Sequence, residues 1–137
     1  MLRPPAVMVH GLADARAALA PGLPVTLLSA SGAALFAGCL WWREVVARAR
    51  GEFPRVAVHD ILDCGDGSGQ AMAALRIGVV HLVLWAEAPG WGAVAAIAAA
   101  QGGEVLVKPP PALDLADSRA RRRLQDWLSR DTGNGVG

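Results

Sequence analysis

Charge, lysine and cysteine are scarce in this sequence. Charged residues make up 18% of the 137 residues, and 13 basic against 12 acidic side chains leave a formal net charge of +1. A balance so close to neutrality provides no field that would draw the chain to nucleic acid or to an anionic membrane. Lys108 is the single lysine, so the basic side chains are almost all arginines. We therefore expect no nucleic-acid partner.

Cysteine is limited to Cys39 and Cys64, whose separation is not that of paired metal ligands. An isolated pair in a domain of this size is typical of a reduced, cytoplasmic protein, so we expect two free thiols. The three histidines do not lie at ligand spacing either. The sequence thus predicts no metal and no cofactor.

Long apolar runs are also absent. The longest run within a predicted helix, residues 32–42, is well short of the roughly 20 residues that span a bilayer. Residues 6–9 are too few for the central region of a secretory signal. We expect a cytoplasmic protein without a membrane segment.

Hydrophobic residues are abundant, at 53%, and short β-branched runs alternate with longer alanine-rich runs. This alternation is typical of βα units and a parallel sheet. The expected strands are residues 6–10, 25–29, 56–61, 79–85 and 104–108, and the expected helices are residues 12–20, 32–50, 68–77, 90–101 and 118–129. The predicted fold is an α/β three-layer sandwich with a five-stranded, mainly parallel sheet, in the flavodoxin-like order 2-1-3-4-5 or a similar doubly wound order.

The sequence predicts a single α/β domain over residues 1–130. Residues 109–111 are three prolines and predict a stiff connector into the last helix. Residues 131–137 are rich in glycine and predict a disordered tail.

Candidate ligand-binding residues follow the expected strands, because open α/β sheets bind ligands beyond the carboxyl ends of their strands. The set is His10, Ser29, Ser31, Gly32, Asp63, Asp66, Ser68 and Lys108.

Two of the strand-to-helix turns stand out by composition. Residues 29–33 combine small residues with two hydroxyls and no acid, which suits an anion, although Ser31 is also an ordinary helix cap. Residues 63–69 hold three glycines and two carboxylates, and the plainer interpretation is that Asp66 or Ser68 caps the next helix. The loop matches neither a phosphate loop nor a dinucleotide fingerprint.

Nucleophile and base candidates are few. Cys64 lies near a predicted helix start, where a thiolate is favoured, but the flanking aspartates oppose its ionisation. His10 follows a strand at the edge where chemistry is expected, whereas His59 and His81 fall within predicted strands. Catalytic residues are not assigned.

The pair Lys108-Pro109 resembles the lysine–proline step of response-regulator receiver domains, which have five βα units. That resemblance implies an acidic pair after the first strand, where this chain has His10 and Gly11. It also implies a hydroxyl after the fourth strand, where Trp85 and Ala86 stand. A phosphoryl-accepting role is therefore not expected.

Two features concern possible partners. Trp41, Trp42 and the uncharged run 91–100 predict apolar helical surface that a second subunit would cover, although alanine is also tolerated in water. Residues 118–129 place arginines around Leu124 and Leu128, which indicates a packed helix with a solvated basic face rather than a nucleic-acid site.

The favoured hypothesis is a binding domain that holds a small, anionic ligand at the carboxyl ends of the strands and forms a homodimer through apolar helices. One alternative is a small enzyme with Asp63 or Asp66 as acid or base and Ser29, Ser31 or Lys108 orienting an oxyanion. The other is a receiver-like protein interaction module.

Overall fold

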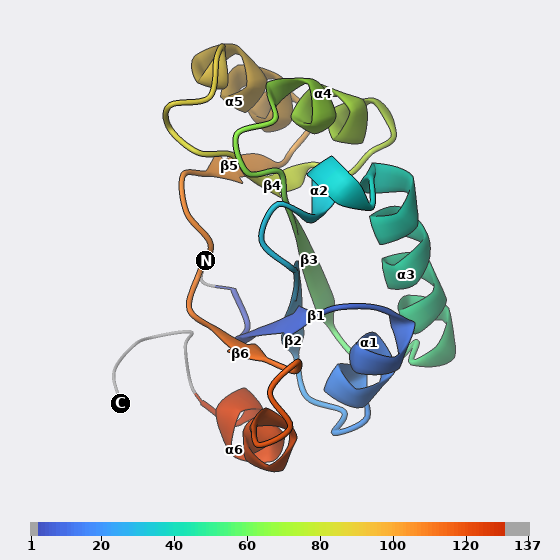
Figure 1. The fold of residues 1–137 in the computed structure, drawn as a ribbon. Coiled ribbons are helices and arrows are strands. Elements are labelled where there is room, and N and C mark those ends of the chain that lie inside the picture. The colour runs from blue at the N-terminus through green and yellow to red at the C-terminus, as the bar shows by residue number, and fades with distance from the viewer. Residues whose placement is uncertain (1–2, 131–137) are drawn as a thin grey trace. The chain divides into compact units, whose positions relative to one another are not determined.

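A computed structural model describes residues 3–130 of the chain (Figure 1). It is an α/β fold with a six-stranded sheet, and each strand pair whose register is given is parallel. The strands are β1 (Ala6–Val9), β2 (Val25–Ser29), β3 (Val58–Asp63), β4 (His81–Val83), β5 (Glu104–Leu106) and β6 (Ala112–Asp114). The predicted α/β class with a parallel sheet is confirmed, and the fold is consistent with a three-layer sandwich.

The strand order is β5-β4-β3-β2-β1-β6, so the order 2-1-3-4-5 is wrong. Each strand from β2 to β5 lies beside the strand that precedes it in the chain, which is the usual relation of consecutive strands. The far side of β1 is taken by β6, a strand that the prediction lacked. This order is not that of receiver domains, so the resemblance to them is confined to Lys108 and Pro109.

The chain divides into two compact units. The first unit takes in the chain up to Leu28, the segment Val45–Asp60 and the chain from Pro110 onward, and the second takes in Ser29–Glu44 and Ile61–Pro109. Strands β2 and β3 and helix α3 (Cys39–Glu52) contribute residues to both.

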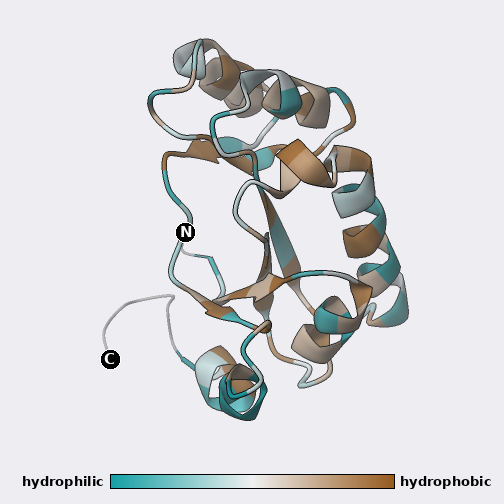
Figure 2. Ribbon diagram, in the orientation of Figure 1, coloured by the Kyte–Doolittle hydropathy of each residue, from teal (hydrophilic) through white to brown (hydrophobic). Residues whose placement is uncertain are grey.

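The first unit contains α1 (Leu12–Leu19), the 3-10 helix η1 (Ala120–Arg123) and α6 (Leu124–Leu128) beside its strands. Parallel β1 and β6 are in register, with Ala6 opposite Ala112. Their fully or almost fully buried side chains form the core with those of α1 and α6, and Figure 2 shows the strands as largely hydrophobic. The core members include Val7, Val9, Leu19, Leu27, Leu113, Leu124 and Leu128.

The second unit contains α2 (Ala33–Phe36), α4 (Ser68–Arg76) and α5 (Trp91–Ala100). Its strand pairs are parallel, with Leu62 opposite Leu82 and His81 opposite Glu104. His81 lies within a strand of this unit, and His59 lies in the part of β3 that belongs to the first unit, so both are within strands as predicted. The core includes Trp42, Ile61, Leu62, Leu75, Leu82, Leu84 and Val94.

The predicted helix 32–50 is in fact two helices, α2 and α3. Gly38 lies between them with φ +89°, a left-handed conformation that glycine adopts without the steric cost of a Cβ. The predicted helix 118–129 is likewise η1 followed by α6. In both cases the apolar spacing correctly predicted helical structure, but the prediction of one continuous helix was wrong.

Strand β6 follows the proline run directly, so residues 109–111 lead into a strand and not into the last helix. Its three residues include no β-branched side chain, which is why the pattern did not predict it. The expected tail 131–137 lies outside the described residues. Within residues 3–130, no helix combines the length and the apolar character that a membrane crossing requires.

Candidate functional site

The carboxyl ends of β2 and β3, both in the second unit, are joined by one buried carboxylate. Asp63 is the last residue of β3, 1% exposed, and its Oδ1 accepts hydrogen bonds from the backbone N–H of Gly32 at 3.1 Å and of Gly65 at 2.8 Å. Its own N–H donates to Ser29 Oγ at 2.9 Å. The sequence predicted that the turn after β2 could bind an external anion. The Gly32 N–H of that turn instead donates to the Asp63 carboxylate of the chain itself.

Leu35 of α2 lies across this network. A Cβ built on Gly65, whose φ is +56°, would stand 3.2 Å from Leu35 Cδ1, and one built on Gly67 would stand 2.5 Å from Leu35 Cδ2. Glycine is favoured at position 65 by its left-handed backbone, and a side chain at position 67 would displace the ends of Leu35 and Gln70. An apolar side chain thus lies beside the loop that follows β3.

The structure brings Ser29, Gly32 and Asp63 together, and the other candidates of this unit take no part in their hydrogen bonds. Ser31, Asp66 and Lys108 are exposed. Neither expected cap is formed: the residues before α2 and α4 are Gly32 and Gly67, without a side-chain cap bond. The Ser68 hydroxyl donates instead to the carbonyl of Pro89.

Cys64 follows β3 and is fully buried. Burial, with smaller contributions from Asp63 and Cys39, raises the pKa of the Cys64 thiol to about 12. A thiol with so high a pKa is protonated near neutral pH and is a poor nucleophile. Both cysteines are free, as predicted.

His10 lies in the first unit, just beyond β1, and it meets residues that the sequence did not single out. Its Nε2 is 2.6 Å from Asp114 Oδ1, at the end of β6. Its backbone N–H donates to Asp14 Oδ2 at 2.9 Å, and Asp14 Oδ1 in turn accepts from Arg121 Nη2 at 2.6 Å. An imidazole, two carboxylates and a guanidinium therefore gather at the carboxyl ends of β1 and β6.

Partial burial alone would raise the pKa of Asp114. Hydrogen bonds from the backbone N–H of Ala116 and from His10, together with the charge of His10, outweigh burial, so the pKa of Asp114 lies below its ordinary value. The carboxylate is thereby kept ionised beside the imidazole. Since the side chains of His10 and Asp114 are 36% and 48% exposed, water screens this pair.

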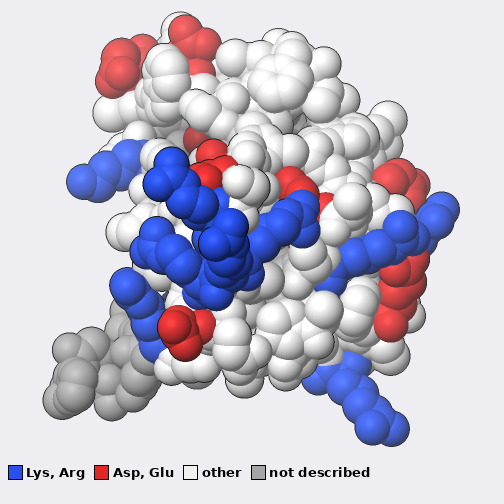
Figure 3. Space-filling model, turned by 60° about the horizontal axis from the view of Figure 1, so that its bottom comes forward, with Lys and Arg blue, Asp and Glu red and all other residues white. Residues whose placement is uncertain are grey.

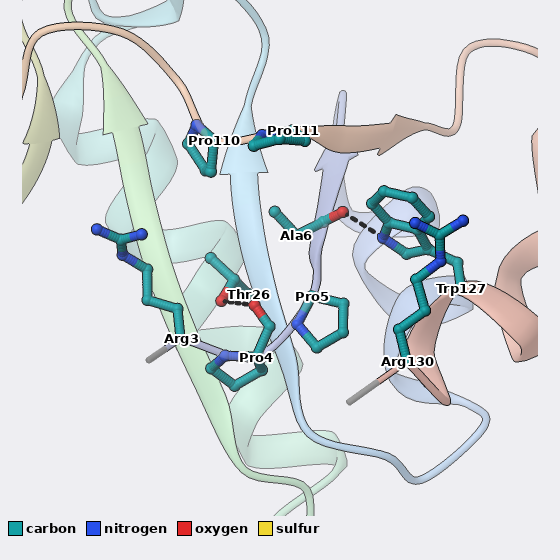
Figure 4. A pocket seen from close by; sticks show the side chains of 9 residues that line it. All are labelled: Arg3, Pro4, Pro5, Ala6, Thr26, Pro110, Pro111, Trp127 and Arg130. Atoms are coloured by element: carbon teal, nitrogen blue, oxygen red, sulfur yellow. Dashed lines mark hydrogen bonds between the residues drawn. The ribbon is translucent and has the colours of Figure 1, made fainter. Parts of the chain in front are cut away.

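A pocket of about 320 Å³ lies at the opposite, amino-terminal ends of the strands of the first unit (Figure 4). Its walls come from the residues before and at the start of β1, β2 and β6, from Trp127 of α6 and from Arg130, which follows that helix. They are Arg3, Pro4, Pro5, Ala6, Thr26, Pro110, Pro111, Trp127 and Arg130. Sequence reasoning missed this pocket because it considered only the carboxyl ends of the strands.

Two hydrogen bonds fix the walls of the pocket. Trp127 Nε1 donates to the Ala6 carbonyl at 2.7 Å, and Thr26 Oγ1 donates to the Pro4 carbonyl at 2.8 Å. The guanidinium carbon of Arg130 lies 4.3 Å from the centroid of the Trp127 ring, a cation–π distance. Of the nine lining residues, the two that are charged, Arg3 and Arg130, are both cations.

The arginines around α6 are exposed, as the sequence predicts, while Leu124 and Leu128 are buried. Figure 3 shows basic side chains gathered on the face where this segment lies. Two of these arginines make contacts within the fold: Arg121 forms an ion pair with Asp14, and Arg130 stacks over the Trp127 ring.

Comparisons with known proteins assign no family. No known family model matches the chain, and no curated protein is similar enough to count as a relative. The chemistry of the two strand edges and of the pocket is therefore the basis for a functional interpretation.

Proposed function

We propose that this chain is a binding domain for a small organic anion, held in the pocket of the first unit. The observation that carries the proposal is a cavity of about 320 Å³ whose charged lining residues are both arginines. That volume is at the lower end of the range of small-molecule sites. None of the nine described lining residues is acidic, so the charged groups among them attract an anion.

The donors of the pocket support an anionic ligand. Thr26 and Trp127 already donate their polar hydrogens to backbone carbonyls, and the four prolines have no N–H. A guanidinium offers five N–H groups in a planar fork that suits a carboxylate or a phosphate. Arg130 therefore has the chemistry for the principal contact with the ligand.

The proposed site differs from the carboxyl ends of the strands, where the ligand was first expected. In the second unit, the backbone N–H of Gly32 donates to the buried carboxylate of Asp63. An external anion there would have to displace a buried carboxylate, which is costly. The nine described residues that line the amino-terminal pocket include no carboxylate.

Thermal unfolding with a panel of organic anions tests this proposal, because a ligand that binds only the folded state raises Tm by mass action. Arg130→Gln should weaken binding at least tenfold. Arg122→Gln, an exposed arginine of η1 outside the pocket, should leave binding unchanged. If no anion raises Tm more than an equal ionic strength of sodium chloride does, the proposal is wrong.

A second candidate function is acid–base catalysis at the carboxyl ends of β1 and β6. The favouring observation is the 2.6 Å contact between His10 Nε2 and Asp114 Oδ1, since a carboxylate on one ring nitrogen fixes the orientation of the imidazole. Asp63 is a weaker candidate for the base because it is buried and bound by two N–H groups. Hydrolysis of p-nitrophenyl acetate should fall in His10→Asn if His10 is a base, and equal rates would exclude this role.

We also propose that the protein is cytoplasmic and forms a homodimer. Two free thiols accord with a reducing compartment. The apolar surface that supports a dimer belongs to the second unit but differs from the expected one, because Trp42 is fully buried. Among residues 3–130, the large exposed apolar side chains are Leu35, Phe36, Leu40, Trp85 and Val107. Light scattering at tens of micromolar, where a weak dimer is populated, should give a dimer in the wild type and a monomer in Phe36→Ser.

A further inference from the structure

We infer that the ligand of this pocket is an aromatic monocarboxylate that carries no amino group, an inference that rests on the proposed anion site. The size of the cavity is the first reason. Its volume of about 320 Å³ far exceeds the roughly 10–15 Å³ that a single water molecule requires in a cavity. Inorganic phosphate, with five non-hydrogen atoms, would leave much of this space unfilled, whereas a ring with a short acid side chain occupies it.

The walls are the second reason. Pro4 and Pro5 lie on one side of the pocket and Pro110 and Pro111 on the other (Figure 4). Pyrrolidine rings present C–H surface without donors, so they favour an apolar body between them. Proline rings also pack against aromatic faces in the recognition of proline-rich segments. The body of the ligand is therefore a flat ring.

The positive charge in the pocket favours a ligand with an aromatic ring over one with an aliphatic ring. A guanidinium attracts the negative face of an aromatic ring, an attraction that a saturated ring of the same size lacks. Arg130 already makes this contact with Trp127, whose indole is held by the Ala6 carbonyl. The arrangement fixes the guanidinium before the ligand arrives, so less freedom is lost on binding.

The same charges select a carboxylate and exclude an ammonium group. A carboxylate can accept two parallel hydrogen bonds from the guanidinium fork of Arg130. An amino acid would bring its ammonium group toward the Arg130 guanidinium, and the nine described lining residues include no carboxylate to receive it. Like charges in a partly enclosed site repel, so zwitterions are selected against.

Isothermal titration of the full chain with four probes tests the inference. Phenylacetate should bind at least tenfold more tightly than cyclohexylacetate, which has the same carboxylate on a saturated ring, and than phenylalanine. Inorganic phosphate should be the weakest. Arg130→Gln should weaken phenylacetate binding at least tenfold and Arg130→Lys by less, while Arg122→Gln should bind like the wild type, with circular dichroism confirming that each variant is folded.

The outcomes separate the inference from the proposal beneath it. If cyclohexylacetate binds as tightly as phenylacetate, the aromatic inference is wrong and the anion site stands. If phenylalanine binds as tightly, the exclusion of an ammonium group is wrong. If none of the carboxylates binds, or if Arg130→Gln and Arg122→Gln bind phenylacetate like the wild type, the pocket is not the anion site and both fail.

Discussion

In the second unit Asp63 ends β3 with 1% of its surface exposed, whereas in the first unit Asp114 ends β6 with 48% of its side chain exposed. Both carboxylates accept backbone N–H bonds, Asp63 from Gly32 and Gly65 and Asp114 from Ala116. The two carboxylates differ in their access to water, which surrounds Asp114 but not Asp63. A hydrogen bond that is broken in the interior leaves polar groups unsatisfied, while one broken at the surface is replaced by water. An aspartate ends a strand in both units. We therefore expect the buried Asp63 to stabilise the fold, whereas the exposed Asp114 is accessible to solvent and to a substrate.

The largest effect is expected for Asp63→Ala. This change leaves two amide N–H groups without an acceptor in a buried site, at about 1–3 kcal/mol each, so the free energy of unfolding should fall by about 3 kcal/mol or more. Asp63→Asn keeps a carbonyl oxygen as acceptor and should lose less. Urea unfolding of the two variants measures both values. A loss below about 1 kcal/mol in Asp63→Ala would mean that the buried network contributes little.

Ser29→Ala should have an intermediate effect. The Ser29 hydroxyl accepts from the Asp63 N–H at 2.9 Å and donates to the Ala30 carbonyl at 3.1 Å, and the residue is fully buried. Its loss should cost about 1–2 kcal/mol by urea unfolding. Ser31→Ala, two residues away and exposed, is the matched control and should be close to the wild type. Equal losses in the two variants would contradict the distinction by burial.

A smaller effect is expected from the His10–Asp114 pair. A double-mutant cycle with His10→Ala and Asp114→Ala should give a coupling energy below about 1 kcal/mol, because both side chains are more than one-third exposed. A coupling of several kcal/mol would show that this pair is shielded from water and that the contrast between the two strand ends is false.

The smallest effect is a change in the pH dependence of stability. Since the pKa of Asp114 is lowered in the folded state, its stabilising contribution is present above the pKa of the unfolded chain and is lost as pH falls through the lowered value. The difference in unfolding free energy between wild type and Asp114→Asn should therefore shrink as pH falls from neutrality to below the ordinary range of an aspartate. If this difference in unfolding free energy instead grows as pH falls, the ionised Asp114 destabilises the fold and the prediction is wrong.

Local patterns were sufficient to predict most elements of the fold. The span of β2 matches the predicted residues 25–29, and α1, α4 and α5 lie within one residue of the predicted bounds. The break at Gly38 was not predictable, because a single glycine in an alanine-rich run is compatible with a continuous helix. Strand β6 was missed for lack of a β-branched residue, and the order of the other five strands is not encoded in local patterns.

The candidate sites were less predictable because they depend on residues far apart in the chain. Asp114 meets His10 across 104 positions only because β6 lies beside β1. The same pairing brings Pro110 and Pro111 into one pocket with Pro4 and Pro5. Without β6 in the prediction, neither group could be assembled. Ser29, Gly32 and Asp63 were correctly expected at one edge, yet their mutual hydrogen bonds could not be inferred from their positions.

The indole N–H resonances of the five tryptophans, measured by two-dimensional NMR during titration with phenylacetate, test the anion site most directly. Trp127 lines the pocket and its Nε1 donates to Ala6, so its resonance, assigned with Trp127→Phe, should move with a saturable dependence on ligand. Trp85, exposed in the second unit, is the internal reference and should stay fixed. Loss of the Trp127 shift in Arg130→Gln, but not in Arg122→Gln, is the expected result. A stationary Trp127 resonance, or equal shifts of Trp127 and Trp85, would contradict the proposed site.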